Sequence, residues 1–210
     1  QMFDASVGRH GLPIAERGSE ASGASVAWLK EHGREDEVIA WRGRLSDLIV
    51  VGRPGDSEDV LTPMVLNAAL FETGRPVMVV PPKSESLARK RVAISWNGSQ
   101  QSARAVSFAI KILEQAEAVM VLTADSSRTS GTRGPELATY LEWHGIQPDT
   151  KVFESPAGSV GPRLLEECSN FGADLLVTGA YTHSRMRQFI LGGVTKHVLG
   201  HAQIPMLMAH

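Results

Sequence analysis

The chain has 210 residues, of which 42% are hydrophobic and 21% are charged, and its formal net charge at pH 7 is −2. This is the composition of a folded globular protein, and the balanced charge argues against a nucleic-acid-binding protein. No apolar stretch approaches the roughly 20 residues that span a bilayer, and no secretory signal is recognisable. The single cysteine, Cys168, excludes an internal disulfide and fits a reducing compartment. We therefore expect a cytoplasmic protein that binds neither nucleic acid nor membranes.

The first half of the chain predicts a short set of strands and helices. Residues 1–23 are rich in Gly and Ser and show no convincing strand. Apolar runs predict strands at 25–30, 48–51 and 77–80, and helical periodicity predicts helices at 35–45 and 60–71. A polar stretch headed by Pro81 and Pro82 predicts a linker, which we place at 83–89.

The second half alternates strands with helices in a regular way. The pattern predicts strands at 92–96, 119–122, 151–154, 175–178 and 206–208, and helices at 102–114, 135–144, 160–171 and 195–201. Continuous apolar strands separated by helices predict a parallel sheet covered on both faces. In such sheets, ligands bind beyond the carboxyl ends of the strands, where the strand order reverses.

Two segments of the first half recur in the second half. Asp47-Leu-Ile-Val-Val-Gly and Asp174-Leu-Leu-Val-Thr-Gly are 127 positions apart, and Pro76-Val-Met-Val-Val and Pro205-Met-Leu-Met-Ala are 129 apart. The order and the spacing both repeat, which predicts tandem domains at 1–82 and 90–210. The opening strands and helices of the second copy have no counterpart in the first, so we expect the first copy to be incomplete and to pack against other residues.

The segment from Thr178 to Thr195 is the candidate ligand site. A buried strand ends at Thr178-Gly179, and after a loop Gly192-Gly193-Val194-Thr195 opens a helix, which is a place where backbone amides can hold phosphate. The structural alternative is that these glycines end a strand and form a tight turn. Asn97 offers hydrogen bonds to a ribose or base, or serves as the turn residue before Gly98, while Ser99 suits the N-cap of the next helix.

These residues resemble the universal stress protein family in its tandem-domain form. Nucleotide-binding members of that family carry Gly, two residues, Gly, nine residues, Gly, and then Ser or Thr. Gly179 and Gly192 keep this spacing, whereas Thr182 stands at the second Gly and Gly193 stands where Ser or Thr is expected. Asn97 stands where the family has an acid that faces the adenine and ribose.

The resemblance implies an α/β fold, a doubly wound parallel sheet sandwich of the adenine nucleotide alpha hydrolase-like or flavodoxin-like type. It also implies a stress-response regulatory binding protein with an ATP-type site, with Mg, in the second copy. The residues implied to bind the adenine nucleotide are Asn97, Ser99, Thr178, Gly179, Tyr181, Thr182, Gly192, Gly193, Val194 and Thr195. In the first copy, Asp56, Glu58 and Asp59 put negative charge where phosphate would lie, so we expect no nucleotide there.

Two alternatives stay open. One is an interaction or dimerisation module that keeps the fold and takes no cofactor. The other is a slow ATP hydrolase, although Asn97 cannot act as a base and no catalytic residue or metal ligand set is recognisable in the sequence. Cys168 suits a small buried hydrophobic residue.

The resemblance also implies how strands meet. Family members commonly pair through their last strands, so we predict an antiparallel pair between 206–208 and 77–80 within the chain. We also expect a homodimer.

Overall fold

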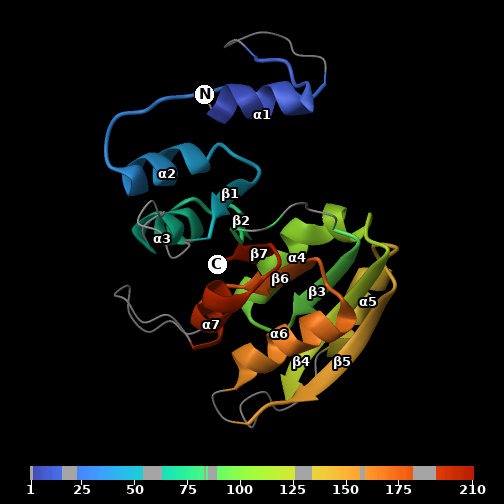
Figure 1. The fold of residues 1–210 in the computed structure, drawn as a ribbon. Helices are drawn as coiled ribbons and strands as arrows, with labels where there is room; N and C mark the ends of the chain where they lie inside the picture. Colours follow the sequence, from blue (N-terminus) through green and yellow to red (C-terminus); the bar gives the residue numbers. More distant parts are fainter. Residues whose placement is uncertain are drawn as a thin grey trace. The chain divides into compact units, whose positions relative to one another are not determined.

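The computed structural model of the chain describes residues 2–15, 23–53, 63–82, 84, 89–125, 134–156, 159–181 and 193–210. The chain divides into two compact units, Gln1–Arg34 and Glu35–His210. Figure 1 labels the helices and strands of both units. The predicted division into domains at 1–82 and 90–210 remains a prediction, and its linker at 83–89 falls within the second unit.

The first unit contains a helix that the sequence analysis missed, α1 (Met2–His10). The predicted strand at 25–30 is wrong, because Val26 forms only an isolated bridge with Ile14. Val26 exchanges backbone hydrogen bonds with Ala15 and Pro13, and Pro13 has no N–H with which to extend a ladder. The ring of Trp28 instead packs against Phe3 of α1, with 5.2 Å between centroids.

The second unit contains the remaining elements, and every helix and strand predicted after residue 34 is present with small changes of its bounds. In chain order they are α2 (Glu35–Gly43), β1 (Ile49–Gly52), α3 (Pro63–Glu72), β2 (Val77–Val80), β3 (Arg91–Ser95), α4 (Gln100–Leu113), β4 (Ala118–Asp125), α5 (Gly134–Glu142), β5 (Pro148–Glu154), α6 (Val160–Phe171), β6 (Leu175–Gly179), α7 (Gly193–His201) and β7 (Met206–Ala209). Strands β4 and β5 are longer than predicted because their parallel ladder continues into polar residues as far as Asp125 and Glu154.

Seven strands form one sheet in the order β1-β2-β7-β6-β3-β4-β5, as Figure 1 shows. Neighbouring strands run parallel except β2 and β7, which are antiparallel. From β3 the chain winds outward first through β4 and β5 and then through β6 and β7 on the other side. This is the predicted doubly wound α/β sandwich, and the fold class is confirmed.

Strands β2 and β7 pair as the sequence analysis predicted. Met78 lies opposite Leu207 at the centre of this antiparallel ladder. On either side of it, Ile49 of β1 pairs with Val77, and Leu176 of β6 pairs with Met206. Ile49 and Leu176 are 127 positions apart, and Val77 and Met206 are 129 positions apart, which are the offsets of the repeated sequence segments. The ladders β1–β2 and β6–β7 therefore correspond residue by residue.

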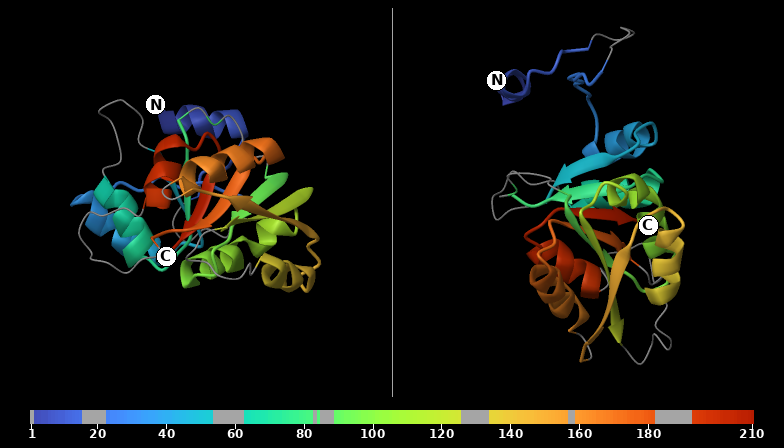
Figure 2. Two further views of the ribbon diagram at one scale, coloured as in Figure 1. Left: turned by 90° about the horizontal axis from the view of Figure 1, so that it is seen from below. Right: turned by 90° about the vertical axis from the view of Figure 1, so that its right-hand side faces the viewer.

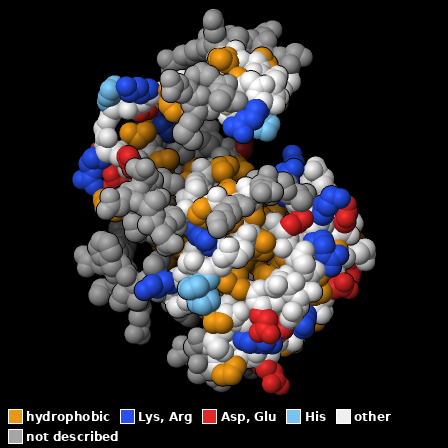
Figure 3. Space-filling view, viewed as in Figure 1, with side chains coloured by type: hydrophobic (Ala, Val, Ile, Leu, Met, Phe, Trp, Pro, Cys, Tyr) orange, Lys and Arg blue, Asp and Glu red, His pale blue; other side chains and the backbone are white. Residues whose placement is uncertain are grey.

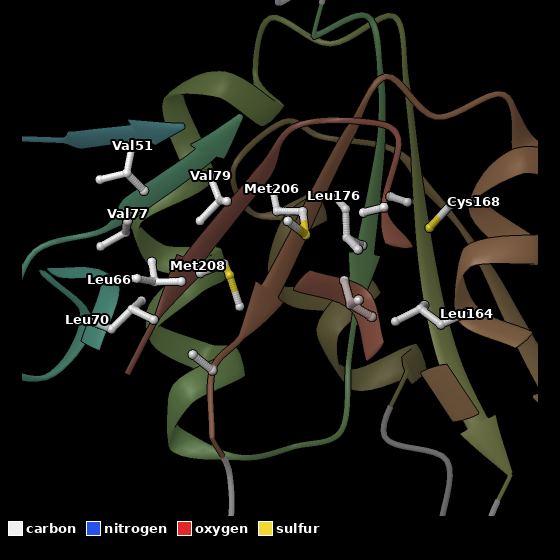
Figure 4. Packing of buried hydrophobic residues seen from close by; sticks show 14 of the residues in the cluster. Val51, Leu66, Leu70, Val77, Val79, Leu164, Cys168, Leu176, Met206 and Met208 are labelled. Carbon is white, nitrogen blue, oxygen red and sulfur yellow. The ribbon is translucent and has the colours of Figure 1, made fainter. Parts of the chain in front are cut away.

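Hydrophobic side chains fill both faces of the sheet. One face carries α3, α6 and α7 and the other carries α4 and α5, and Figure 2 shows the sheet between these layers. On the first face, Met206 of β7 lies between Val79 of β2 and Leu176 of β6, as Figure 4 shows. The core therefore runs without interruption from strands of the first half of the chain to strands of the second half.

The surface charge is mixed. Figure 3 shows Lys and Arg side chains interspersed with Asp and Glu side chains on the face that it presents. Some of these charges form ion pairs, as Lys90 does with Glu117 at 2.7 Å. The carboxylate of Glu167 on α6 is buried instead and pairs with both Lys151 and Arg163. None of the described helices has the length and apolar character that crossing a membrane requires.

Candidate functional site

The predicted site lies where the strand order reverses, between β3 and β6. These strands are parallel neighbours in which Ser95 pairs with Thr178. The chain therefore leaves both strands at the same edge of the sheet, after Ser95 on one side and after Gly179 on the other. This is the edge at which doubly wound sheets bind ligands.

The turn after β3 is organised by its own hydrogen bonds. Gly98 has a φ of 70°, and the side-chain oxygen of Asn97 accepts from the backbone N–H of Ser99 at 3.1 Å. The Ser99 hydroxyl in turn accepts from the N–H of Ser102 at 3.1 Å, as an N-cap of α4. Ser99 thus has a structural role here, whereas the exposed Asn97 keeps its NH₂ group as the part that a ligand could engage.

Helix α4, rather than a ligand, explains the glycine at the end of β6. A Cβ atom on Gly179 would lie 2.6 Å from the backbone nitrogen of Ser102 and 2.8 Å from the carbonyl carbon of Gln101. Only glycine permits this close approach between strand and helix. The neighbouring Thr178 is buried, and its hydroxyl donates to the Gly179 carbonyl at 3.2 Å. Both residues therefore have structural roles at this edge.

Tyr181 connects the end of β6 with two helices. Its φ is 58°, a left-handed conformation that is uncommon for a residue with a side chain. Its N–H donates to the Thr195 hydroxyl oxygen of α7 at 3.4 Å, while its phenol donates to the Asn67 side-chain oxygen of α3 at 3.3 Å. The ring packs against Phe71 with 4.9 Å between centroids, and burial raises the pKa of the phenol to about 12.

His210 also packs against Phe71. Its ring lies edge-on to Phe71 with 4.4 Å between centroids, and its Nδ1 is 3.1 Å from the carbonyl oxygen of Ala180. Arg104 of α4 donates to the His210 carbonyl at 2.8 Å. Sequence reasoning missed Asn67, Phe71 and His210. The only signal was that Asn67 is a polar residue within the otherwise apolar run of α3.

Helix α7 presents its first turn at this edge. Gly193 and Val194 are exposed and Thr195 is half-buried, and the first turn carries no acidic residue. The first amides of a helix lack intrahelical partners and lie at the positive end of its dipole, so they favour an anion. A Cβ atom on Gly193 would meet no described atom within 4 Å, so no described residue blocks the space beside these amides. The start of α7 thus fits a phosphate group.

Some predicted residues lie outside the described part of the chain. They are Thr182 and Gly192 of the site, together with the acidic Asp56, Glu58 and Asp59 of the first copy. Among the described residues, no group of three or more His, Cys, Asp or Glu side chains could hold a metal ion. Cys168 is buried on α6, and burial raises the pKa of its thiol to about 12.

Comparison with known proteins identifies the family. Residues 89–210, more than half of the chain, match the model of the Universal stress protein family. The chain belongs to this family. A search of curated protein sequences gave no match.

Solved structures extend the likeness in fold to the first half of the chain. A universal stress protein from Archaeoglobus fulgidus superposes with a TM-score of 0.65 at 16% identity, covering 83% of this chain and 66% of that chain. A functionally unknown protein from Pseudomonas aeruginosa superposes with a TM-score of 0.61 at 20% identity, covering 98% of this chain and 75% of that chain. The chain thus spans just under two thirds of the length of the Archaeoglobus fulgidus protein and three quarters of the length of the Pseudomonas aeruginosa protein. At these identities the likeness concerns the fold.

Proposed function

We propose that this universal stress protein is a stress-response regulatory protein that binds an adenine nucleotide, ATP with Mg, at the edge formed by β3 and β6. The observation that carries the proposal is the 3.4 Å hydrogen bond from the Tyr181 N–H to the Thr195 hydroxyl oxygen. It holds the first turn of α7 at the end of β6, and β6 is the neighbour of the strand that leads to Asn97. We place this function in the cytoplasm, where a lone thiol such as Cys168 stays reduced.

Each part of the edge has a distinct role in this proposal. The amides of Gly193, Val194 and Thr195 would hold the phosphate groups, because they lie at the positive end of α7. The NH₂ group of Asn97 would donate to the ribose or the base. Mg²⁺ would be held by phosphate oxygens and water, as is usual for this ion at nucleotide sites.

A second candidate is an interaction module that keeps the fold without a nucleotide. Two residues of the glycine motif favour it, because Gly179 makes room for α4 and Tyr181 turns its side chain towards Asn67 of α3. Slow ATP hydrolysis is a third candidate. This candidate needs a base that activates a water molecule, and Asn97 in the turn after β3 cannot act as one.

Isothermal titration calorimetry of the purified 210-residue chain with ATP and Mg²⁺ tests the proposal. We expect saturable heat for ATP and none for inorganic phosphate alone, because the proposed contacts include the ribose or base. Absence of heat at millimolar ATP would favour the interaction module. Phosphate release faster than in buffer would instead favour the hydrolase.

A further inference from the structure

Two histidines lie one turn apart on helix α7. His197 and His201 occupy positions i and i+4 of this helix, so their side chains project from the same face. Their rings are stacked, with 4.2 Å between centroids and an interplanar angle of 12°. His197 is half-buried and His201 is exposed, and His201 is the last residue of α7. The pair is thus accessible from solvent and separate from the first turn of α7, where we place the phosphate groups.

The imidazole of His201 has a defined tautomer. Its Nδ1 atom lies 2.9 Å from the backbone carbonyl oxygen of His197. Because a carbonyl oxygen only accepts, Nδ1 carries the proton and donates it, and Nε2 of the neutral ring keeps its lone pair. Histidines that bind metals commonly donate their other ring N–H to a backbone carbonyl in this way. The Nε2 atom of His201 is therefore available as a metal ligand.

Helix α6 holds the ring of His197 from one side. A Cβ atom on Gly161 of α6 would lie 2.8 Å from the Cβ of His197 and 3.1 Å from its Cγ and Cδ2 atoms. Only glycine permits this close approach of the two helices. No described residue forms a hydrogen bond with a ring nitrogen of His197. The ring is thus placed by packing, and its nitrogens are left for a ligand.

The surroundings favour one class of cation. Among the described residues, no group of acidic side chains is present that would suit Mg²⁺ or Ca²⁺. Lys196 precedes His197, and Arg53 donates to the carbonyl oxygen of Ala202 just after α7, so positive charge opposes an ion held by charge alone. The carbonyl end of the helix dipole partly offsets this repulsion at His201. Imidazole nitrogens suit Zn²⁺, Cu²⁺ and Ni²⁺, which form bonds with them.

We propose that His197 and His201 form a binding site for a divalent transition-metal ion such as Zn²⁺. Two histidines at this spacing on one helix face are a known pair of zinc ligands. Zn–N bonds of about 2.0–2.1 Å at a tetrahedral angle place the two ligand nitrogens about 3.3 Å apart. The rings are parallel and 4.2 Å apart, so they turn about their Cβ–Cγ bonds to converge on the ion. Water fills the other coordination positions.

Titration calorimetry of the 210-residue chain with Zn²⁺, in buffer that contains millimolar Mg²⁺, tests this site. We expect saturable binding of Zn²⁺ despite the Mg²⁺. His197→Ala and His201→Ala should each weaken it by at least about tenfold, because a single imidazole loses the gain from binding through two linked groups. His32→Ala is the matched control, since His32 is an exposed histidine of the unit Gln1–Arg34, and its loss should leave the affinity unchanged.

Nuclear magnetic resonance of the histidine ring nitrogens tests the site in the parent chain, without any substitution. On addition of Zn²⁺, the Nε2 resonance of His201 should shift while its Nδ1 keeps the proton, and a ring nitrogen of His197 should shift at the same Zn²⁺ concentration. The proposal is wrong if the parent chain does not bind Zn²⁺, or if either alanine variant binds it as tightly as the parent. It is also wrong if His32→Ala weakens binding as much as they do, or if only one of the two rings responds.

Discussion

Met78 lies directly opposite Leu207 in the antiparallel ladder between β2 and β7, and the two side chains are 2% and 1% exposed. This pair joins the strands of the first half of the chain to those of the second half. Since both side chains pack in the same core cluster, neither half of the sheet can be exposed without opening the other. The unit from Glu35 to His210 should therefore unfold cooperatively.

Leu207→Ala should lower the free energy of unfolding by about 2–5 kcal/mol, the usual range for a leucine truncated in a packed core. Urea unfolding followed by both fluorescence and circular dichroism measures this change. The control is Val152→Ala, because Val152 is 47% exposed and its truncation should cost little. A Leu207→Ala variant as stable as the control would contradict the shared core.

Gly52 and Gly179, which occupy corresponding positions in the two ladders, should respond differently to the same change. Gly179→Ala should destabilise the fold by about 1–3 kcal/mol, because the new methyl group meets backbone atoms of α4 that cannot move freely. Gly52→Ala should be neutral or stabilise by up to about 1 kcal/mol, since the methyl group meets no described atom within 4 Å and the unfolded chain loses freedom. Equal effects in thermal unfolding would show that α4 does not explain Gly179.

Much of the sheet could be predicted because its strands are apolar and its helices are periodic. The β2–β7 pairing was predicted from the resemblance to the universal stress protein family, whose members commonly pair through their last strands. Helix α1 was missed because its nine residues mix apolar, small, polar and charged side chains beside a Gly- and Ser-rich segment. At the site, the contacts of Tyr181 with α3 could not be predicted, because no local pattern links residues 114 positions apart.

The pH dependence of stability should report on Tyr181. Burial raises the pKa of its phenol from 10.0 to about 12, so its contribution to stability is fully present below pH 10 and is lost as the pH rises towards 12. Tyr181→Phe should cost about 0.5–1.5 kcal/mol at neutral pH, through the lost hydrogen bond to Asn67, and should make the alkaline decline less steep. Urea unfolding across this range checks it, and parallel pH profiles for parent and variant would contradict it.

Cys168 should be unreactive in the folded protein. Its thiol is buried and its pKa is raised from 9.0 to about 12, chiefly by desolvation. Since the thiolate is the reactive form, a colorimetric thiol reagent in mildly alkaline buffer should label the chain only after urea is added. Stoichiometric labelling of the native chain at the rate of a free thiol would show that Cys168 is accessible.

Gly193 allows a matched pair of variants at the proposed phosphate position. Gly193→Glu should abolish ATP binding, because a carboxylate would lie beside the amides that hold phosphate. Gly193→Gln should keep most of the affinity, since it adds nearly the same volume without charge. A negative charge in the first turn of α7 interacts favourably with the helix dipole and so stabilises the helix. Loss of binding in Gly193→Glu could therefore not be attributed to unfolding. Equal ATP affinity for the two variants in calorimetry would contradict this placement.

The proposed nucleotide site is tested most directly by titrating the isotope-labelled chain with ATP and Mg²⁺ and following backbone amide resonances. Binding at the proposed edge should shift the amides of Tyr181, Gly193, Val194 and Thr195 together with that of Asn97, with one common dissociation constant. Amides of the outer strand β5, such as that of Val152, should not move. Shifts confined to other parts of the sheet, or no shifts at saturating ATP, would contradict the account.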